Sequence, residues 1–387
     1  MFYVQHGFGK STKLDEVVDA GDTEGVILSP AHEDPSSLAG TSDRLRTRGV
    51  QVLVDPQSFV YSLNPQGSGR HHGAHGLDLD DLHWAPTTAT INNHLGAVES
   101  VNRACGTAEL MIAPSPLQTS LMDYWMPTAI QYARSASDFW GTERTLASVV
   151  IDENVLTDWS HIQEWLDVLT TLRVRGFYLL VNRNRAAYPP AAWNTHGLTN
   201  LLRIIYTLTD LNEYELHWGY SDFDGLLGLT VGATSAASGW SYGHRQFSTA
   251  RWNEVRKGGA PAIPRVTMAK LLAAIRNNEA EDIESTDVWR EVTTRAVRDS
   301  FDGRTFDSLK APEAQVQHLV SLSRQASLVA GVVGVEARLE MLELRVQRAL
   351  EGFEKVEREG VSLDPRYRGR VRSYRDALAS FREAESL

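Results

Sequence analysis

Carboxylates and an amide stand at the ends of apolar runs along this chain. The run VQVLV ends at Asp55, SVVI ends at Asp152 and Glu153, and FYLLV ends at Asn182. A carboxylate in such a position can act as an acid or a base, or it can accept two N–H groups from a planar ligand. It can equally cap the segment that follows. Position alone leaves both alternatives open.

Eight short apolar runs, separated by helical patterns, must supply the strands that position these side chains. Alternating strands and helices predict a parallel sheet, and eight of them predict a closed barrel. Nearly every run ends in a polar or turn-forming residue, and the carboxyl ends of barrel strands are where active sites form. The runs span residues 2–6, 25–29, 50–55, 109–115, 148–154, 177–182, 214–219 and 232–239.

The pattern changes after Pro264 to helices only. We therefore expect an α/β fold with a (β/α)8 TIM-like barrel over residues 1–264 and a C-terminal α-helical extension over residues 265–387. One segment of the extension has an apolar stripe at helical spacing, which could cover the chain's own surface or form a homodimer or bind a protein partner. The stripe consists of Val335, Leu339, Leu342, Val346, Leu350 and Phe353.

Composition limits the classes of function. The formal net charge is −11, which argues against a broad nucleic-acid surface because phosphate neutralisation supplies most non-specific affinity. Cys105 is the only cysteine, so an internal disulfide and a thiolate zinc site are excluded. The chain has neither a long apolar run nor a signal-type amino terminus, and we expect a soluble cytoplasmic protein without a membrane partner.

Two segments suggest chemistry that we do not expect. The segment GFGKST lacks the first glycine of a phosphate-binding loop, because Val4 stands there, and an ordinary strand-to-helix loop is predicted. An insertion over residues 64–90 could bind a divalent metal, but its composition is more typical of a solvated loop. We expect no metal and no cofactor. The insertion carries His71, His72, His75 and His83 with Asp78, Asp80 and Asp81.

Four segments, in order, resemble the tRNA-guanine transglycosylases. The segment VDPQSFVYSL resembles the family's D-S-G-G-F-Q-V-F-S-L, with Asp55 and Phe59 in matching places. SVVIDEN is similar to its strand ending D-E-C, and YLLVN to its strand ending I-V-Q-G-G. The stretch over residues 219–247 is similar in rhythm to the segment that carries the family's nucleophile.

The resemblance implies a site for guanine. The family excises guanine and installs a 7-deazaguanine through a covalent sugar intermediate. By position, Asp55 would assist proton transfer, Asp152 would accept hydrogen bonds from the guanine edge, and Asn182 would replace a glutamine amide. A carboxylate and an amide can satisfy the donors and the carbonyl of such a base. The other residues that the resemblance places in the ligand site are Phe59, Glu153, Gly219 and Tyr220.

The departures from the family shape the functional hypothesis. The nucleophilic aspartate is replaced at Ala237 or Ser238, and the zinc-binding cysteines are missing. We therefore predict a divergent, zinc-less relative that recognises guanine or a 7-deazaguanine, free or carried on a nucleic acid, nucleotide or protein, in a bacterial deazapurine-modification or antiphage defence system. One alternative is an active glycosidic-bond enzyme with Ser238 as nucleophile, catalysing base exchange or hydrolysis. Another is a non-catalytic scaffold that assembles a complex through its C-terminal helices.

Overall fold

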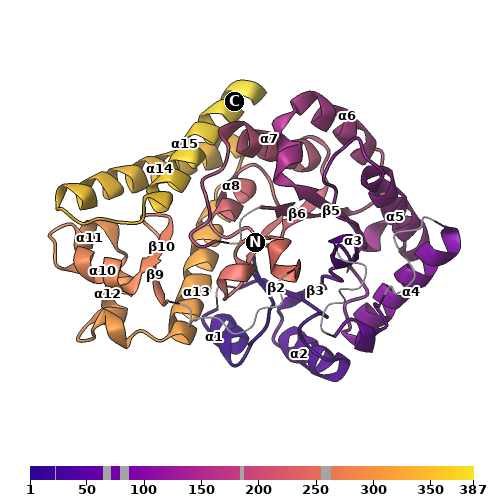
Figure 1. The fold of residues 1–387 in the computed structure, drawn as a ribbon, viewed down its shortest axis with the longest axis horizontal. Coiled ribbons are helices and arrows are strands. Elements are labelled where there is room, and N and C mark those ends of the chain that lie inside the picture. The colour runs from indigo at the N-terminus through magenta and orange to yellow at the C-terminus, as the bar shows by residue number, and fades with distance from the viewer. Residues whose placement is uncertain (22, 64–70, 79–86, 184–186, 254–262) are drawn as a thin grey trace.

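A parallel eight-stranded sheet forms the centre of the molecule (Figure 1). The computed structural model describes residues 1–387 except 22, 64–70, 79–86, 184–186 and 254–262. All eight predicted runs contain a strand, and the strand order is β3-β2-β1-β8-β7-β6-β5-β4. The strands are β1 Phe2–Gln5, β2 Gly25–Leu28, β3 Gln51–Val54, β4 Met111–Ile112, β5 Thr145–Asp152, β6 Gly176–Asn182, β7 Glu215–Trp218 and β8 Ser235–Ser238.

The sheet curls into a nearly closed barrel, which confirms the predicted fold class. The first and last strands pair directly, with Val4 of β1 opposite Ser238 of β8. Strands β3 and β4 lie next to each other without a shared ladder in the part of the chain that the structure describes. Because β4 has only two residues, this edge has little backbone to pair.

Strand alternation divides the barrel's apolar residues into two cores. Successive side chains of a strand point to opposite faces, so one set fills the lumen and the other packs under the helices. Tyr3, Leu53 and Leu180 belong to the lumen core. Phe2 and Val4 belong to the outer core, which continues beneath the surrounding helices.

Helices cover the outside of the barrel. Helix α13 takes the eighth position in this ring, because it packs against α8, α1 and β1. The barrel therefore draws on residues well beyond 264. The helices of the ring and of its loops are α1 Lys13–Asp19, α2 Pro35–Thr47, α3 Val60–Leu63, α4 Thr88–Ala104, α5 Trp125–Trp140, α6 Trp159–Leu169, α7 Thr195–Tyr206, α8 Asp224–Thr230, α9 Ala250–Asn253 and α13 Ala311–Ala330.

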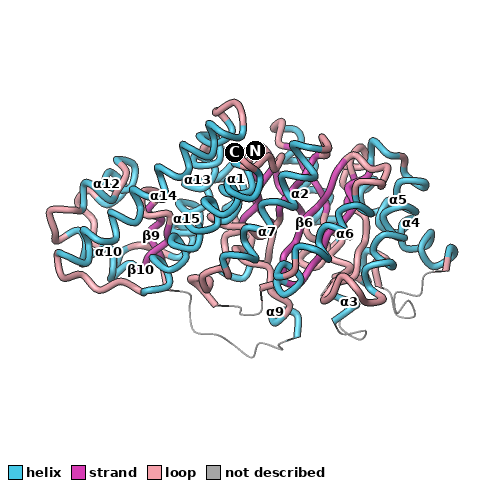
Figure 2. The backbone as a smooth tube through the Cα atoms, turned by 90° about the horizontal axis from the view of Figure 1, so that it is seen from above, coloured by secondary structure: helices cyan, strands magenta, loops and turns pink. Residues whose placement is uncertain are grey.

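A small lateral unit is inserted between β8 and α13 (Figure 2). Sequence patterns indicated only helices after Pro264, but the unit begins with an antiparallel hairpin of β9 Arg265–Met268 and β10 Ala273–Arg276. Each strand has only four residues, which is too short a run for periodicity to distinguish a strand from part of a helix. The short helices that follow are α10 Asn277–Glu284, α11 Trp289–Val292 and α12 Arg295–Phe301.

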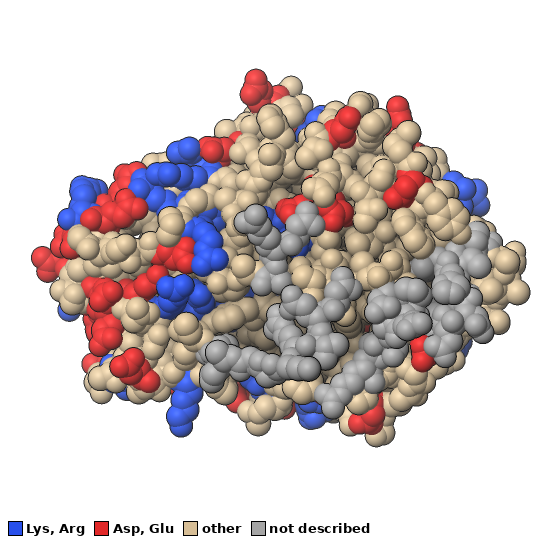
Figure 3. Space-filling model, in the orientation of Figure 1, with Lys and Arg blue, Asp and Glu red and all other residues tan. Residues whose placement is uncertain are grey.

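Two long helices complete the chain, α14 Val335–Arg358 and α15 Pro365–Glu385. The predicted apolar stripe of α14 is buried within the molecule, where α14 packs against α15, α8, α11 and α13. Of the two uses left open for this stripe, the structure shows the covering of the chain's own surface. On the face drawn in Figure 3, charged side chains of both signs gather over this C-terminal part, on the left. No helix among the described residues is both long and apolar enough to cross a membrane.

Candidate functional site at the carboxyl end of the barrel

The three residues expected to share a site lie on the lumen side of β3, β5 and β6, of which only β5 and β6 are neighbours. Asp55, Asp152 and Asn182 each follow a lumen residue by two positions, so strand alternation directs all three to the same side. The backbone N–H of Asp55 still donates to Leu28, which extends the ladder one residue beyond β3. All three side chains are buried.

Asp55 is the centre of a buried polar cluster inside the barrel. The hydroxyl of Tyr178, on β6, donates to its Oδ2 at 3.0 Å, and the backbone N–H of Gln57 donates to its Oδ1 at 2.9 Å. Burial and then the negative charge of Asp55 raise the pKa of Tyr178 well above its ordinary value. The tyrosine therefore keeps its proton and remains a donor to the carboxylate.

Gln57 links Asp55 to two further strands. Its backbone has a left-handed φ of 52°, which turns the chain sharply after Pro56. Its side-chain Oε1 accepts from Ser29 at the end of β2, and its Nε2 donates to the hydroxyl of Tyr220 after β7 at 2.9 Å. We call Asp55, Gln57, Tyr178, Ser29 and Tyr220 the Asp55 cluster.

Gly219 has a steric role in this cluster. A Cβ atom at this position would lie 2.6 Å from the Tyr178 hydroxyl and 2.6 Å from Cδ2 of Leu180. Any other residue would therefore displace the tyrosine that donates to Asp55. The resemblance placed Gly219 and Tyr220 in a ligand site, and the structure places both against the Asp55 cluster.

Aromatic rings pack at the mouth of the lumen beside this cluster. Phe59 meets Phe247 edge to face at 4.8 Å and Trp252 at 5.9 Å between ring centroids, and Phe247 also contacts Tyr220. We call Phe59, Phe247, Trp252 and Tyr220 the aromatic rim. The adjoining cavity, which Asp55, Phe59 and Tyr178 help to line, measures about 10 Å³, room for about one water molecule.

Asp152 and Asn182 bind each other rather than Asp55. Asn182 Nδ2 donates to Asp152 Oδ2 at 2.7 Å across the β5–β6 ladder, and the Asn182 Oδ1 accepts from the backbone of Thr249 at 2.9 Å. The other carboxylate oxygen of Asp152 accepts from the N–H of Asn154. Asp152 thus caps the 3₁₀ turn Glu153–Thr157, one of the two roles that its position allowed.

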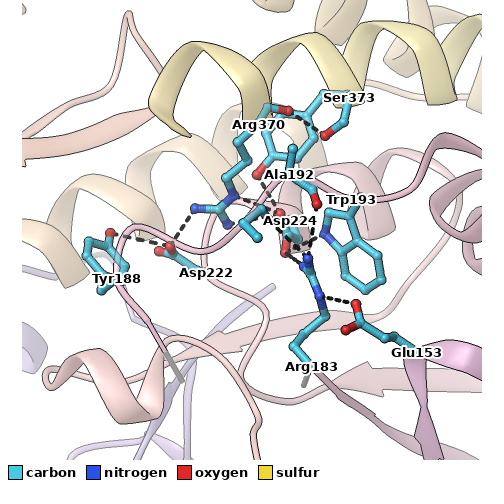
Figure 4. A network of polar contacts seen from close by, with 11 residues as sticks. Glu153, Arg183, Tyr188, Ala192, Trp193, Asp222, Asp224, Arg370 and Ser373 are labelled. Atoms are coloured by element: carbon cyan, nitrogen blue, oxygen red, sulfur yellow. Dashed lines mark hydrogen bonds and ion pairs between the residues drawn. The ribbon is translucent and has the colours of Figure 1, made fainter. Parts of the chain in front are cut away.

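Glu153 belongs to a separate charged network beside the barrel mouth (Figure 4). Its Oε2 accepts from Arg183 Nε at 2.7 Å, and the Arg183 guanidinium lies 3.7 Å from the centre of the Trp193 ring. The Trp193 indole N–H donates to Asp224 at 2.9 Å. Glu153 therefore serves to hold Arg183 rather than to line the Asp55 cluster.

Arg370, from α15, neutralises two aspartates in this network. Its guanidinium donates to Asp222 at 2.9 Å and to Asp224 at 2.9 and 3.1 Å, and Figure 4 shows it pointing from α15 toward both. On the other side of Asp222, the Nε2 of His318 on α13 lies 3.0 Å from Oδ1. We call Glu153, Arg183, Asp222, Asp224, His318 and Arg370 the Arg370 network.

The ionisation states in the network follow from burial and charge. Burial favours the neutral form of Asp222, but Arg370 and His318 outweigh it and hold the pKa well below its ordinary value. Burial, and then the charge of Arg245, lower the pKa of His318 to about 4. The network at neutral pH thus contains ionised Asp222 and Arg370 beside a neutral imidazole.

A smaller charged cluster joins the ends of β1 and β2. Glu33 accepts from Lys10 at 2.6 Å and lies 3.4 Å from Nε2 of the buried His6. Burial raises the pKa of Glu33, but His6 and Lys10 lower it by more, to about 2. Lys10 lies in the GFGKST segment, which is a strand-to-helix loop as predicted.

Ser238 lies apart from the lumen. Its neighbour Ala237 belongs to the lumen core, and Ala236 belongs to the outer core. Because strand side chains alternate between the two faces, Ser238 lies on the outer face with Ala236. The Ser238 hydroxyl is buried and has no hydrogen-bond partner among the described residues. No described base is therefore in place to activate it.

Some residues of the site were not predicted. Tyr178 is a buried strand residue. It lies four positions before Asn182, so strand alternation puts both side chains on the same face, and this was the only sequence signal that Tyr178 faces the lumen. Gln57 lies two positions after Asp55, the spacing of an Asx-type turn, so a local signal for this contact existed. Arg370 lies 146 positions from Asp224, and no local pattern links the two.

Metal binding has no support in the described part of the chain, where no group of three or more His, Cys, Asp or Glu side chains could hold an ion. The structure describes only part of the histidine-rich insertion. His72 is buried against Tyr61, and His75 contacts the Glu33 backbone. His83, Asp80 and Asp81 lie outside the described residues.

Fold and site together define an α/β-barrel protein with a buried carboxylate cluster at the carboxyl end of its strands. A scan against models of known protein families finds no match, and a search of curated proteins finds no relative. The functional argument therefore rests on the geometry of this chain and on the motif resemblance.

Proposed function

We propose that the barrel binds a planar, donor-rich base of the guanine or 7-deazaguanine type beside Asp55. The observation that carries the proposal is a carboxylate held in the lumen under an aromatic rim. A carboxylate accepts two adjacent N–H groups, and aromatic rings stack on the face of a base. The resemblance to the transglycosylases also implies a base beside Asp55, although it gives Asp55 a role in proton transfer and assigns the acceptance of the guanine donors to Asp152.

Binding in this proposal requires the aromatic rim to open. The cavity of about 10 Å³ is far below the roughly 300 Å³ at which ligand pockets begin. Trp252 is the one ring of the rim that is not fully buried, and it also stacks on His32 at 6.3 Å between ring centroids, so we expect Trp252 to be the ring that moves. The Asp152–Asn182 pair forms the adjoining wall.

The proposal does not include covalent base exchange. The lumen position at the end of β8 is Ala237, which offers no nucleophile, and the hydroxyl of Ser238 has the outward parity. A glycosidic centre needs an activated nucleophile or a pair of carboxylates, and Ser238 provides neither. We therefore favour recognition of the base over the active glycosidic-bond alternative.

The test is calorimetric titration of the full chain with guanine and 7-deazaguanine, with adenine as the matched ligand that lacks the same donor edge. Asp55→Asn keeps the shape of the side chain and removes its charge. We expect this change to weaken binding about 10- to 100-fold, because a hydrogen bond to a charged group contributes about 1.5–3 kcal/mol.

Asp158→Asn is the control, because Asp158 caps α6 on the exposed outside of the barrel. It should leave the affinity unchanged. Equal affinity of the wild type and Asp55→Asn, or no heat with either guanine-type base, would refute a base site at Asp55.

A further inference from the structure

A cavity of about 720 Å³ lies where the lateral unit meets α13 and α14, between these helices, α11 and the turn between β9 and β10. We call it the α14 cavity. Its walls are mainly apolar, and the residues used below are Leu271, Val292, Leu328, Met341, Arg345 and Arg348. Ligand pockets typically measure roughly 300–1,000 Å³, with apolar walls and few polar groups. The α14 cavity has this size and character, and it shares no residue with the Asp55 cluster.

Arg345 gives the α14 cavity an unusual charge. The side chain is partly buried, its Nη1 is fully covered, and it makes no hydrogen bond or ion pair with any described residue. Burial lowers the pKa of Arg345. Because protein atoms cover Nη1, only the rest of the guanidinium is available to a ligand in the cavity, and no described residue accepts a hydrogen bond from it.

The other charges around the α14 cavity are already matched or exposed. Glu291 binds Lys355 at 2.5 Å, and Glu351 accepts from Gln347 at 3.0 Å. Lys270 donates to the backbone carbonyl of Glu291 at 2.9 Å. Arg348, one turn from Arg345, is exposed and has no partner in the described part of the chain. Four cationic side chains (Lys270, Arg345, Arg348 and Lys355) and two carboxylates (Glu291 and Glu351) line the cavity, so the net charge of its lining is positive.

We propose that the α14 cavity binds a small organic monocarboxylate with an apolar body. Its carboxylate is held by Arg345, with Arg348 at the edge, and its apolar body packs on Leu271, Val292 and Met341. An arginine pairs with a carboxylate through two parallel hydrogen bonds, which fixes the orientation of the ligand. This inference stands independently of the base site in the barrel.

The probes are decanoate and 4-phenylbutyrate, titrated calorimetrically into the full chain, with decanol as the uncharged counterpart. We expect at least one carboxylate to bind and decanol to bind at least about tenfold more weakly. Arg345→Gln should weaken carboxylate binding about 10- to 100-fold, and Arg345→Lys should restore part of it. Arg358→Gln, on the same helix outside the cavity, is the control and should have no effect.

A second pair of variants tests the site without altering Arg345. Leu328 lines the α14 cavity and is 58% exposed, so a charged residue is tolerated there. Leu328→Glu should abolish carboxylate binding by repulsion and by competing for Arg345, whereas Leu328→Lys should preserve it. Failure of both carboxylates to bind, equal binding of decanol, or indifference to Arg345→Gln would each overturn the proposal.

Discussion

The Asp55 cluster and the Arg370 network are both buried and polar, yet they hold their carboxylates in opposite ways. Asp55 accepts from a tyrosine hydroxyl and a backbone amide, whereas Asp222 and Asp224 share the guanidinium of Arg370. The shared cation of Arg370 makes the Arg370 network a link between the barrel and α15. The Tyr178 hydroxyl and the Gln57 amide that bind Asp55 are uncharged donors. Burial of a carboxylate is therefore a weaker guide to function than the nature of its partners.

The largest expected effect comes from breaking the Arg370 network. Arg370→Met leaves Asp222 and Asp224 buried without their cation, and removing one partner of a buried ion pair costs about 3–5 kcal/mol of unfolding free energy. Urea denaturation measures this loss. Arg372→Met, at an exposed position of the same helix, should change stability little. A loss at Arg370 no larger than at Arg372 would show that the network does not fasten α15.

The next largest effect is on the pH dependence of stability. The pKa of His318 is about 4 in the folded protein, below its ordinary value of 6.5, so its contribution is fully present above pH 6.5 and declines toward pH 4. In that window the unfolded chain binds the extra proton, which costs up to about 1.4 kcal/mol per pH unit. His318→Gln should flatten the stability profile between pH 6.5 and 5 by about one proton.

His94 offers a comparison for this measurement. It is buried outside the Arg370 network, where burial and then the charge of His72 lower its pKa to about 3. His94→Gln should flatten the profile over the same pH range while leaving α15 in place. If His318→Gln and the wild type show the same slope, the proton uptake does not involve the Arg370 network.

The smallest expected effect concerns the Asp55 cluster. Gly219→Ala introduces a Cβ 2.6 Å from the Tyr178 hydroxyl, and such overpacking costs about 1–3 kcal/mol of unfolding free energy. Tyr178→Phe removes the hydrogen bond to Asp55 without the clash and should cost about 1 kcal/mol.

Gly40→Ala is the matched control for that substitution. It lies within α2, where nothing stands within 4 Å of the added Cβ, and alanine favours a helix. It should be neutral or slightly stabilising by urea denaturation. A similar result at Gly219 would mean that Tyr178 can shift freely and that the Asp55 cluster is not held as the structure has it.

The sequence predicted what depends on local periodicity. Alternation and apolar runs located all eight strands, and they put Asp55 and Asp152 at strand ends facing the lumen. Local periodicity could not predict that the carboxylate of Asp152 accepts hydrogen bonds from Asn182 and from the turn that follows it. The contact with Asn182 depends on the register between β5 and β6. The base site itself stays a prediction.

Long-range partners were beyond such patterns. Arg370 looked like any other charge on a helix rich in arginine, and its role appears only when α15 lies over the barrel. The same holds for the aromatic rim, where Phe247 and Trp252 come from the segment after β8 and meet Phe59 from the segment after β3. The spacing of residues within one helix or strand predicts neither the contacts of Arg370 nor those of the aromatic rim.

The position of α13 has a consequence for how the chain is made. Strand β1 is synthesised early, but its outer face is covered by α13, whose residues 311–330 leave the ribosome after the whole lateral unit. The apolar outer face of Phe2 and Val4 therefore lacks this cover until residues 311–330 have been synthesised. A chain stalled before residue 311 would keep this apolar surface uncovered.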